Sequence, residues 1–270
     1  QYVTVVGLTD YGLVTHTLAG LLEKPQPTEV QAAIVHAYAR FNRPEVADVL
    51  LKSWSNYTPS LRTEVVGILL GRRIWTGPLL SAAKAGKVPA TLIPATRRTT
   101  LLSERDPALR ALAEAVLGTL ASGPRAEAVA RYKPAVERAG DSERGRVVFD
   151  RECQVCHKLG ERGHAVGPNL AGVRHRTADE ILVNVLDPNR EVSPEFLEYT
   201  VALDDGRVVT GLVAAETPNS VTLRGREGAE QTILRKNIEE IHSTGKSLMP
   251  EGLEKTVTPA EMGDLIAFLL

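Results

Sequence analysis

The stretch DRECQVCHKLG (150–160) contains both cysteines of this 270-residue chain, Cys153 and Cys156, and His157 follows the second directly. A structural zinc site needs about four ligands, and no second thiol pair completes one here. A thioredoxin-like redox site places its thiols at a helix N-terminus after a strand, whereas the preceding SERGRVVFDRE is typical of a helix. The spacing matches covalent haem attachment, in which both thiols add to porphyrin vinyl groups and the histidine ligates iron. A plain disulfide is the remaining alternative.

The residues before the thiol pair support this interpretation. Gly145, Phe149 and Cys153 recur every four residues and therefore share one face of a helix that leads into the pair. We expect Gly145 to let a second helix cross closely, because it has no side chain. We expect Phe149 to cover the porphyrin.

Residues 1–139 have the periodicity of short helices rich in alanine and leucine. A capping box of Thr28 and Gln31 predicts the start of one helix, and Thr58 as N-cap with Gly71 as stop delimits another. Further helices are expected over 44–54, 106–121 and 123–140. Helices this short must stack to bury their apolar faces. The prediction is a mainly α chain whose N-terminal domain, 1–139, is an α-solenoid of HEAT-like repeats, with a plain helical bundle as the alternative.

Residues 140–270 form the second predicted domain, which begins with helices and loops rich in glycine, proline and asparagine. Within it, 198–242 alternates β-branched and polar residues, with turn signals at LDDGR and TPNS. This pattern predicts four or five short strands, arranged as a small antiparallel sheet or an SH3/Sm-like barrel. A last helix over 258–270 is expected to begin with a capping box of Thr258 and Glu261.

Two loops of this domain resemble those of class I c-type cytochromes. In VGPNL (166–170) the resemblance implies that the carbonyl of Pro168 accepts the Nδ1–H of His157 and orients the ring. An ordinary turn is the other interpretation of Pro168. KSLMPEG, just before the last helix, resembles the axial-ligand loop, which implies Met249 as the sixth iron ligand. The β-rich stretch is then an insertion between the haem-attachment half and this loop.

Other residues could compete with Met249 for the iron. Met262 lies within the last helix, where we expect it to pack or to be exposed. The histidine candidates are His164, His175 and His242. We interpret these as solvated or hydrogen-bonded, and bis-histidine ligation would give a lower potential than Met/His ligation. Arg174 and Arg176 are candidates for pairing with haem propionates, because guanidinium pairs well with carboxylates. The alternative interpretation, that both belong to a solvated basic loop, is at least as well supported.

Residues 140–270 together resemble the PVC-type haem-binding CxxCH proteins, large bacterial proteins with HEAT-like repeats before a C-terminal cytochrome c domain. The matching motifs are GDSERGRVVFDRECQVCH (140–157), VGPNL (166–170), LDPNREV (186–192), DGRVVTGLVAAET (205–217), SLMPEGL (247–253) and DLIAFLL (264–270), with LLKSW (50–54) and LLGRRIWTGPLLSAAKAGKVP (70–89) upstream. The resemblance implies a class I-like cytochrome c fold, one covalent haem c, export to the periplasm and electron transfer. Members often carry an upstream domain resembling sugar dehydrogenases. This chain, which begins QYVTVVGLTDYG, is therefore expected to be the C-terminal part of a larger multidomain redox protein.

Three functions are compatible with these residues. The leading one is electron transfer to a redox protein partner, because His157 and Met249 would close both axial positions. A peroxidase-like catalyst would need an open sixth position. A redox or gas sensor would use the helical region as its partner-binding surface. A net charge of −1, with 43% hydrophobic and 24% charged residues, gives no sign of nucleic-acid or membrane-surface binding. No apolar run approaches the roughly 20 residues of a membrane helix.

Overall fold

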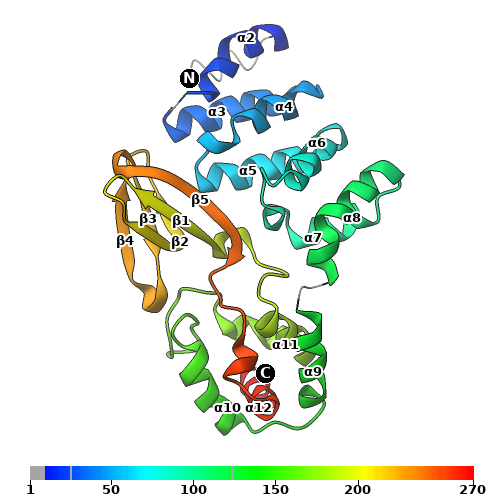
Figure 1. Ribbon diagram of the computed structural model, residues 1–270, viewed down its shortest axis with the longest axis vertical. Helices are drawn as coiled ribbons and strands as arrows, with labels where there is room; N and C mark the ends of the chain where they lie inside the picture. The colour runs from blue at the N-terminus through cyan, green and yellow to red at the C-terminus, as the bar shows by residue number, and fades with distance from the viewer. Residues whose placement is uncertain (1–9, 25, 123–124) are drawn as a thin grey trace. The chain divides into compact units, whose positions relative to one another are not determined.

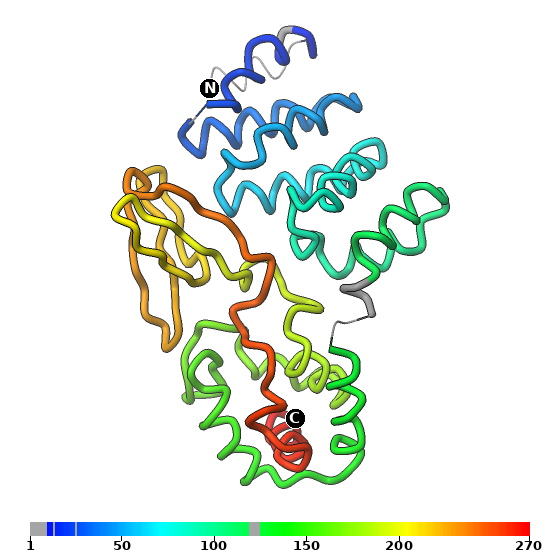
Figure 2. Tube along the Cα trace, viewed as in Figure 1, coloured from blue at the N-terminus to red at the C-terminus, as the bar shows by residue number. Residues whose placement is uncertain are grey.

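The computed structural model describes residues 10–24, 26–122 and 125–270 (Figures 1 and 2). These residues are mainly helical, with one five-stranded sheet. They divide into two compact units. The first comprises the described residues up to Gly118 with 215–221 and 234–236, and the second comprises the described part of 119–214 with 222–233 and 237–270. The sequence-based boundary at 139 lies later than this division at 118/119.

The first unit is built from consecutive short helices. They are α2 (Tyr11–Leu22), α3 (Thr28–Ala39), α4 (Glu45–Lys52), α5 (Pro59–Leu70), α6 (Arg73–Lys84), α7 (Ala95–Leu102) and α8 (Pro107–Ser122), with 3-10 turns at Trp54–Asn56 and Ala90–Leu92. Helices α2 to α6 pack on close neighbours in the sequence: α2 on α3, α3 on α4 and α5, and α6 on α4 and α5. Tyr38 of α3 and Trp75 of α6 are buried, and so is Tyr57 in the bend before α5.

The starts of two of these helices test the capping predictions. α5 begins as predicted: the side chain of Thr58 accepts the backbone N–H of Leu61, and Pro59 is the first helical residue. The capping box predicted for Thr28 and Gln31 is wrong. α3 begins at Thr28 itself, without a side-chain cap. The N-cap is Pro27, which has no backbone N–H for the side-chain oxygen of Gln31 to accept, and the buried amide of Gln31 instead donates to the carbonyl of Asn56 at 3.0 Å.

The second unit holds the remaining helices. They are α9 (Ala126–Val136), α10 (Ser142–Val148), α11 (Ala178–Leu186) and α12 (Pro259–Leu269), with a π-helical turn at Phe149–Cys153 and 3-10 turns at Leu170–His175, Pro194–Phe196, Arg226–Gly228 and Leu253–Lys255. A further 3-10 turn, Arg235–Asn237, has its first two residues in the first unit and its last in the second. Tyr132 of α9 packs in the same apolar core as residues of α10, α11 and α12. The first two positions of the helix predicted over 123–140 lie outside the described residues.

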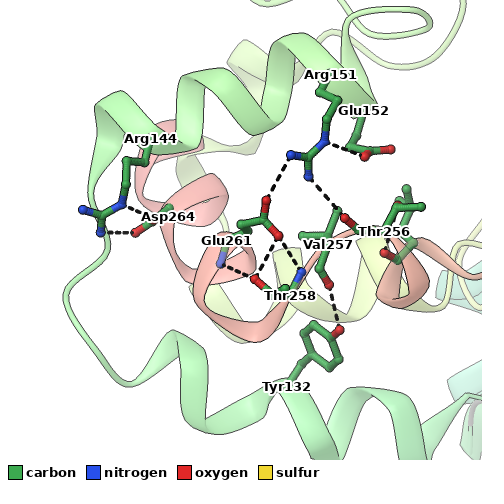
Figure 3. Close-up of polar contacts among 10 residues, drawn as sticks. Tyr132, Arg144, Arg151, Glu152, Thr256, Val257, Thr258, Glu261 and Asp264 are labelled. Atoms are coloured by element: carbon green, nitrogen blue, oxygen red, sulfur yellow. Dashed lines mark hydrogen bonds and ion pairs between the residues drawn. The ribbon is translucent and has the colours of Figure 1, made fainter.

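The capping box predicted at the start of α12 is confirmed (Figure 3). Thr258 Oγ1 accepts the backbone N–H of Glu261, and the Glu261 carboxylate accepts both the backbone N–H and the hydroxyl of Thr258. Arg151, in the π-helical turn, donates to the same carboxylate at 3.0 Å. These hydrogen bonds hold down the pKa of Glu261. The turn that ends at Cys153 is thus joined to the N-terminus of α12.

Gly145 lies where α10 and α12 cross. A Cβ at this position would come 1.9 Å from the carbonyl oxygen of Asp264, so only glycine fits. Asp264, almost fully buried, accepts from Arg144 at 2.7 and 3.1 Å and from the backbone N–H of Asp141 at 2.7 Å. The hydrogen bond from Arg144 is the main cause that lowers the pKa of Asp264. The close crossing expected at Gly145 is therefore confirmed.

The sheet contains all the strands of the chain that the structure describes. They are β1 (Leu197–Leu203), β2 (Val208–Glu216), β3 (Ser220–Arg224), β4 (Glu230–Leu234) and β5 (Ile238–Ser247), in the order β4-β3-β2-β1-β5. Both partners of β1 run antiparallel to it, with Thr200 opposite Thr210 on β2 and opposite His242 on β5. The prediction of four or five antiparallel strands is confirmed. β5 extends past 242, the predicted end of the β-rich stretch, and ends at Ser247, two residues before Met249.

Candidate functional site

The thiol pair lies at the end of α10, where the helix widens into a π-helical turn. The carbonyl of Phe149 accepts the N–H of Gln154 at 3.0 Å, and the carbonyl of Cys153 accepts from Cys156 at 3.1 Å and from His157 at 2.9 Å. The backbone therefore turns tightly through the CxxCH segment. No disulfide joins Cys153 and Cys156, so the disulfide alternative is not realised.

The loop after His157 folds back onto this segment through backbone hydrogen bonds. The carbonyl of Cys156 accepts from Val166 at 3.0 Å and from Gly167 at 2.7 Å. Gly163 has a left-handed conformation, φ 76°, and a Cβ there would come 2.1 Å from the carbonyl oxygen of His157. A side chain at position 163 would therefore both strain the backbone and push the loop away from the histidine.

The imidazole of His157 is held in one orientation. Its Nδ1 lies 2.8 Å from the carbonyl oxygen of Pro168. A carbonyl can only accept, so Nδ1 carries the proton and Nε2 is left as the nitrogen that can bind a metal. Burial lowers the pKa of His157, which favours the neutral ring that ligation needs, although the Pro168 carbonyl partly opposes this shift.

Gly167 packs directly against the ring of His157. A Cβ at Gly167 would come 2.6 Å from Cε1 and 3.0 Å from Nδ1 of His157. We expect Gly167→Ala to displace the ring, lengthen its bond to Pro168 and lower the yield of correctly ligated protein by roughly tenfold, which corresponds to about 1.4 kcal/mol of strain. The measurement is the ratio of Soret to protein absorbance in purified material. If the parent and Gly167→Ala had equal ratios of Soret to protein absorbance, the assigned role of Gly167 would be contradicted.

His157 and the two cysteines line a cavity of about 400 Å³ in the second unit. Its other walls are largely apolar and come from α11, α12, the loop after His157 and the segment after β5. Representative side chains are Val166, Leu170, Ile181, Val185, Leu248 and Leu265. The volume and the apolar lining are those of a cofactor site. Two thiols and a neutral imidazole on one apolar wall are the groups that a covalently attached porphyrin requires, so these residues fit haem.

The thiols are poorly suited to a redox reaction of their own. Burial raises the pKa of Cys153 to about 12, with a smaller contribution from the charge of Glu152. Burial also raises the pKa of Cys156, and the nearby Arg226 partly offsets that effect. Reactive cysteines in redox enzymes have lowered pKa values, because the thiolate is the nucleophile. These shifts disfavour a thioredoxin-like function.

The other residues singled out in the sequence divide between the cavity and its surroundings. Met249, Pro168 and Arg176 line the cavity with His157. Arg176 also pairs with Glu191, 3.8 Å away, which lines the cavity too. Met262 is buried in the core of the second unit instead. Among the residues that line the cavity, none of the candidate histidines appears. These are His164, His175 and His242, and all three are exposed.

Phe149 and Arg174 are not on the cavity wall. Phe149 is fully buried in the core, with its ring centroid 5.6 Å from that of Phe268 on α12. Because Phe149 shares a helix face with Gly145, the face that meets α12 carries both residues. That Phe149 also covers the porphyrin stays a prediction. Arg174 is exposed on the 3-10 turn Leu170–His175.

A contact that the sequence analysis missed joins the β3–β4 turn to the attachment segment. Glu227 donates its backbone N–H to the carbonyl of Val155 at 3.0 Å, and Arg224 donates to the carbonyl of Ala165 at 3.3 Å. Glu227 is in the left-handed region, at φ 58°. A strained residue in contact with a functional segment is a feature that only the folded structure reveals. The sheet therefore supports the thiol segment at Val155 in addition to leading to Met249.

Relieving this strain should stabilise the second unit. Glu227→Gly can adopt φ 58° without a Cβ clash and keeps the N–H that bonds Val155, so we expect a gain of up to about 1 kcal/mol in the free energy of unfolding. Glu227→Ala, which removes the same charge but keeps a Cβ, should stay within about 0.5 kcal/mol of the parent. Urea unfolding of the three proteins measures both effects. A gain shared by the two variants would point to the charge instead of the backbone.

Comparison with known proteins identifies this part of the chain. Residues 142–193 match the family model for cytochrome c. The segment that resembles a cytochrome c-553-like protein of Synechocystis is 58 residues long and 36% identical; it covers 21% of this chain and 54% of that protein. The chain thus spans about half the length of this curated relative.

The site therefore lies in a cytochrome c domain, and its cofactor is covalently bound haem c with its iron. Within the residues that the structure describes, no helix has both the length and the apolar character required to cross a membrane.

Proposed function

We propose that this chain is a mono-haem electron-transfer protein in which His157 and Met249 occupy the two axial positions of the iron. The observation that carries the proposal is that both side chains line one apolar cavity together with Cys153 and Cys156. Of the two methionines in the chain, Met262 is buried in the core and does not line the cavity. With both positions filled by protein, no coordination site is left for a substrate.

Each residue of the site has a part in this function. Haem c supplies the one-electron exchange between ferrous and ferric iron. Cys153 and Cys156 anchor the group. The carbonyl of Pro168 accepts the Nδ1–H of His157, with 2.8 Å between nitrogen and oxygen, so that Nε2 is free to ligate. The apolar side chains of the cavity exclude water, which limits reorganisation during electron exchange. Arg176, which lines the cavity, is the candidate partner for a propionate.

The wider context is also part of the proposal. Short helices that pack on close neighbours in sequence, from α2 to α6, support HEAT-like stacking in the N-terminal domain, 1–139. The cytochrome c domain supports an exported, periplasmic protein of the PVC-type CxxCH group, as the C-terminal part of a larger redox protein. The electron partner is then another redox protein or an upstream dehydrogenase-like domain.

Binding of carbon monoxide tests whether protein side chains occupy both axial positions of the iron. The ferrous protein in its native state should not bind carbon monoxide within the time of a stopped-flow experiment, because Met249 occupies the position that the gas would take. It should exchange electrons rapidly with small soluble redox mediators. Rapid carbon monoxide binding, or peroxide turnover by the unmodified protein, would instead favour a gas sensor or a peroxidase-like catalyst.

A further inference from the structure

We propose that Asn189 is the positioning residue of the Met249 loop, because its side-chain amide bonds the chain both before and after the methionine. This inference rests on the proposed ligation by Met249. Asn189 belongs to the LDPNREV stretch after α11, far from the loop in sequence, and only 8% of its surface is exposed. No role is assigned to it in the site described above.

The two ends of the amide reach two residues to either side of Met249. Oδ1 of Asn189 accepts the backbone N–H of Ser247 at 2.7 Å. Nδ2 of Asn189 donates to the carboxylate of Glu251 at 2.6 Å. The side chain therefore spans the segment SLMPE, with Met249 at its centre. One amide supplies both an acceptor and a donor, which few other side chains can do.

Ser247, two residues before the methionine, also bonds Met249 itself. The hydroxyl of Ser247 accepts the backbone N–H of Met249 at 3.1 Å. Ser247 is also the last residue of β5 and lies opposite Leu197 of β1. The N–H of Leu248 bonds the carbonyl of Phe196 at 3.3 Å. On this side the loop is tied to the edge of the sheet.

Glu251, two residues after the methionine, is anchored in a different way. The Glu251 carboxylate that accepts from Asn189 also lies 3.9 Å from the guanidinium of Arg125. Arg125 is paired with Glu254 as well, in the 3-10 turn before α12. Asn189 is therefore the group that joins the sheet side of the loop to its α12 side, and this joining restricts the positions that Met249 can take.

Restricting the loop matters because ligation by a methionine competes with the conformational freedom of the chain that carries it. Losing the bonds of a buried amide should raise the population of open loop roughly fivefold to 150-fold, which corresponds to about 1–3 kcal/mol. Asn189→Asp keeps the acceptor for Ser247 but removes the donor and places a second carboxylate against Glu251. The loop should then open more often, and Met249 should leave the iron more often.

The experiment combines a backbone measurement with an iron measurement on the holoprotein. Hydrogen exchange followed by mass spectrometry reports on the peptide that contains 247–251. The reduction potential and the carbon monoxide binding rate of the ferrous protein report on the ligand. We expect Asn189→Asp to speed exchange in this peptide at least tenfold, to lower the potential and to speed carbon monoxide binding. Asn219→Asp, the same change at an exposed turn residue, should alter none of these readings.

A second variant covers the case in which Asn189→Asp does not accumulate as folded protein. Glu251→Ala removes an exposed partner and leaves the bond from Ser247 to Asn189 intact, so we expect exchange to quicken about threefold, in line with the loss of a single bond. Unchanged exchange in both variants would overturn the proposal, whatever ligates the iron. Faster exchange with an unchanged potential and unchanged carbon monoxide rate would overturn the link to Met249. If hydrogen exchange in this peptide quickened but Met249→Ala left the potential and the carbon monoxide rate of the parent unchanged, the anchorage of the loop would be upheld and the proposed ligation refuted.

Discussion

Met249→Ala is expected to lower the reduction potential of the protein by on the order of 0.1 V or more. Methionine with histidine gives a c-type haem a higher potential than histidine with water or a second histidine, and axial ligands span roughly 0.8 V in all. Alanine at this position removes the only methionine that lines the cavity among the described residues. The ferrous variant should also bind carbon monoxide. Potentiometric titration and stopped-flow mixing measure the two effects.

The second methionine provides a matched control. Met262 is fully buried in the core cluster and does not line the cavity. Met262→Leu is a nearly volume-conserving change that should cost less than about 1.5 kcal/mol of stability and leave the potential unchanged. If the two variants shifted the potential equally, or if Met249→Ala left it where it was, ligation by Met249 would be refuted.

Gly145→Val is expected to unfold the second unit or to leave it without stable haem. The Cβ would come 1.9 Å from the Asp264 carbonyl and 2.8 Å from Cβ of Phe268, so α10 and α12 would have to separate. Overpacking in a tight core costs about 1–3 kcal/mol and more where backbone is the obstacle, out of a total of about 5–15 kcal/mol. Separation would also weaken the bonds from Arg144 and Asp141 to Asp264. Thermal unfolding followed by circular dichroism measures the loss.

A glycine in open surroundings separates this effect from the general cost of replacing glycine. A Cβ at Gly225, in the β3–β4 turn of the same unit, would meet only the carbonyl of Ala229 at an ordinary 3.8 Å. Gly225→Ala should therefore leave the unfolding temperature nearly unchanged. Equal unfolding temperatures for Gly145→Val and the parent would show that the two helices do not cross as closely as the structure has them.

The parts of the fold that the sequence predicted are those encoded by local patterns. The helical spacing of Gly145 and Cys153 predicted a close crossing before the thiol pair, and alternating β-branched residues predicted the strands. The capping box of Thr258 and Glu261 is of the same kind. The helical repeats and the domain boundary at 139 remain predictions.

The parts that the sequence did not predict depend on tertiary contacts. Gln31 has the pattern of a capping residue, yet it bonds the carbonyl of Asn56. Phe149 is on the predicted helix face, but periodicity cannot say whether that face meets a cofactor or another helix; here it meets Phe268. The pairing of Asn189 with Ser247 and Glu251 joins segments about 60 residues apart. No local pattern in one sequence contains that information.

The most direct test of the account uses the presence of two methionines in the chain. Protein labelled with carbon-13 at the methionine methyl groups should give two methyl resonances in the ferrous, diamagnetic state. If Met249 ligates the iron, its methyl group lies over the porphyrin ring, and the ring current moves one proton resonance far upfield; that resonance should vanish in Met249→Ala. The other resonance, from Met262 in the core, should stay in the ordinary aliphatic range. Two ordinary methyl resonances in the native ferrous protein would contradict ligation by Met249, and with it the closed electron-transfer site proposed here.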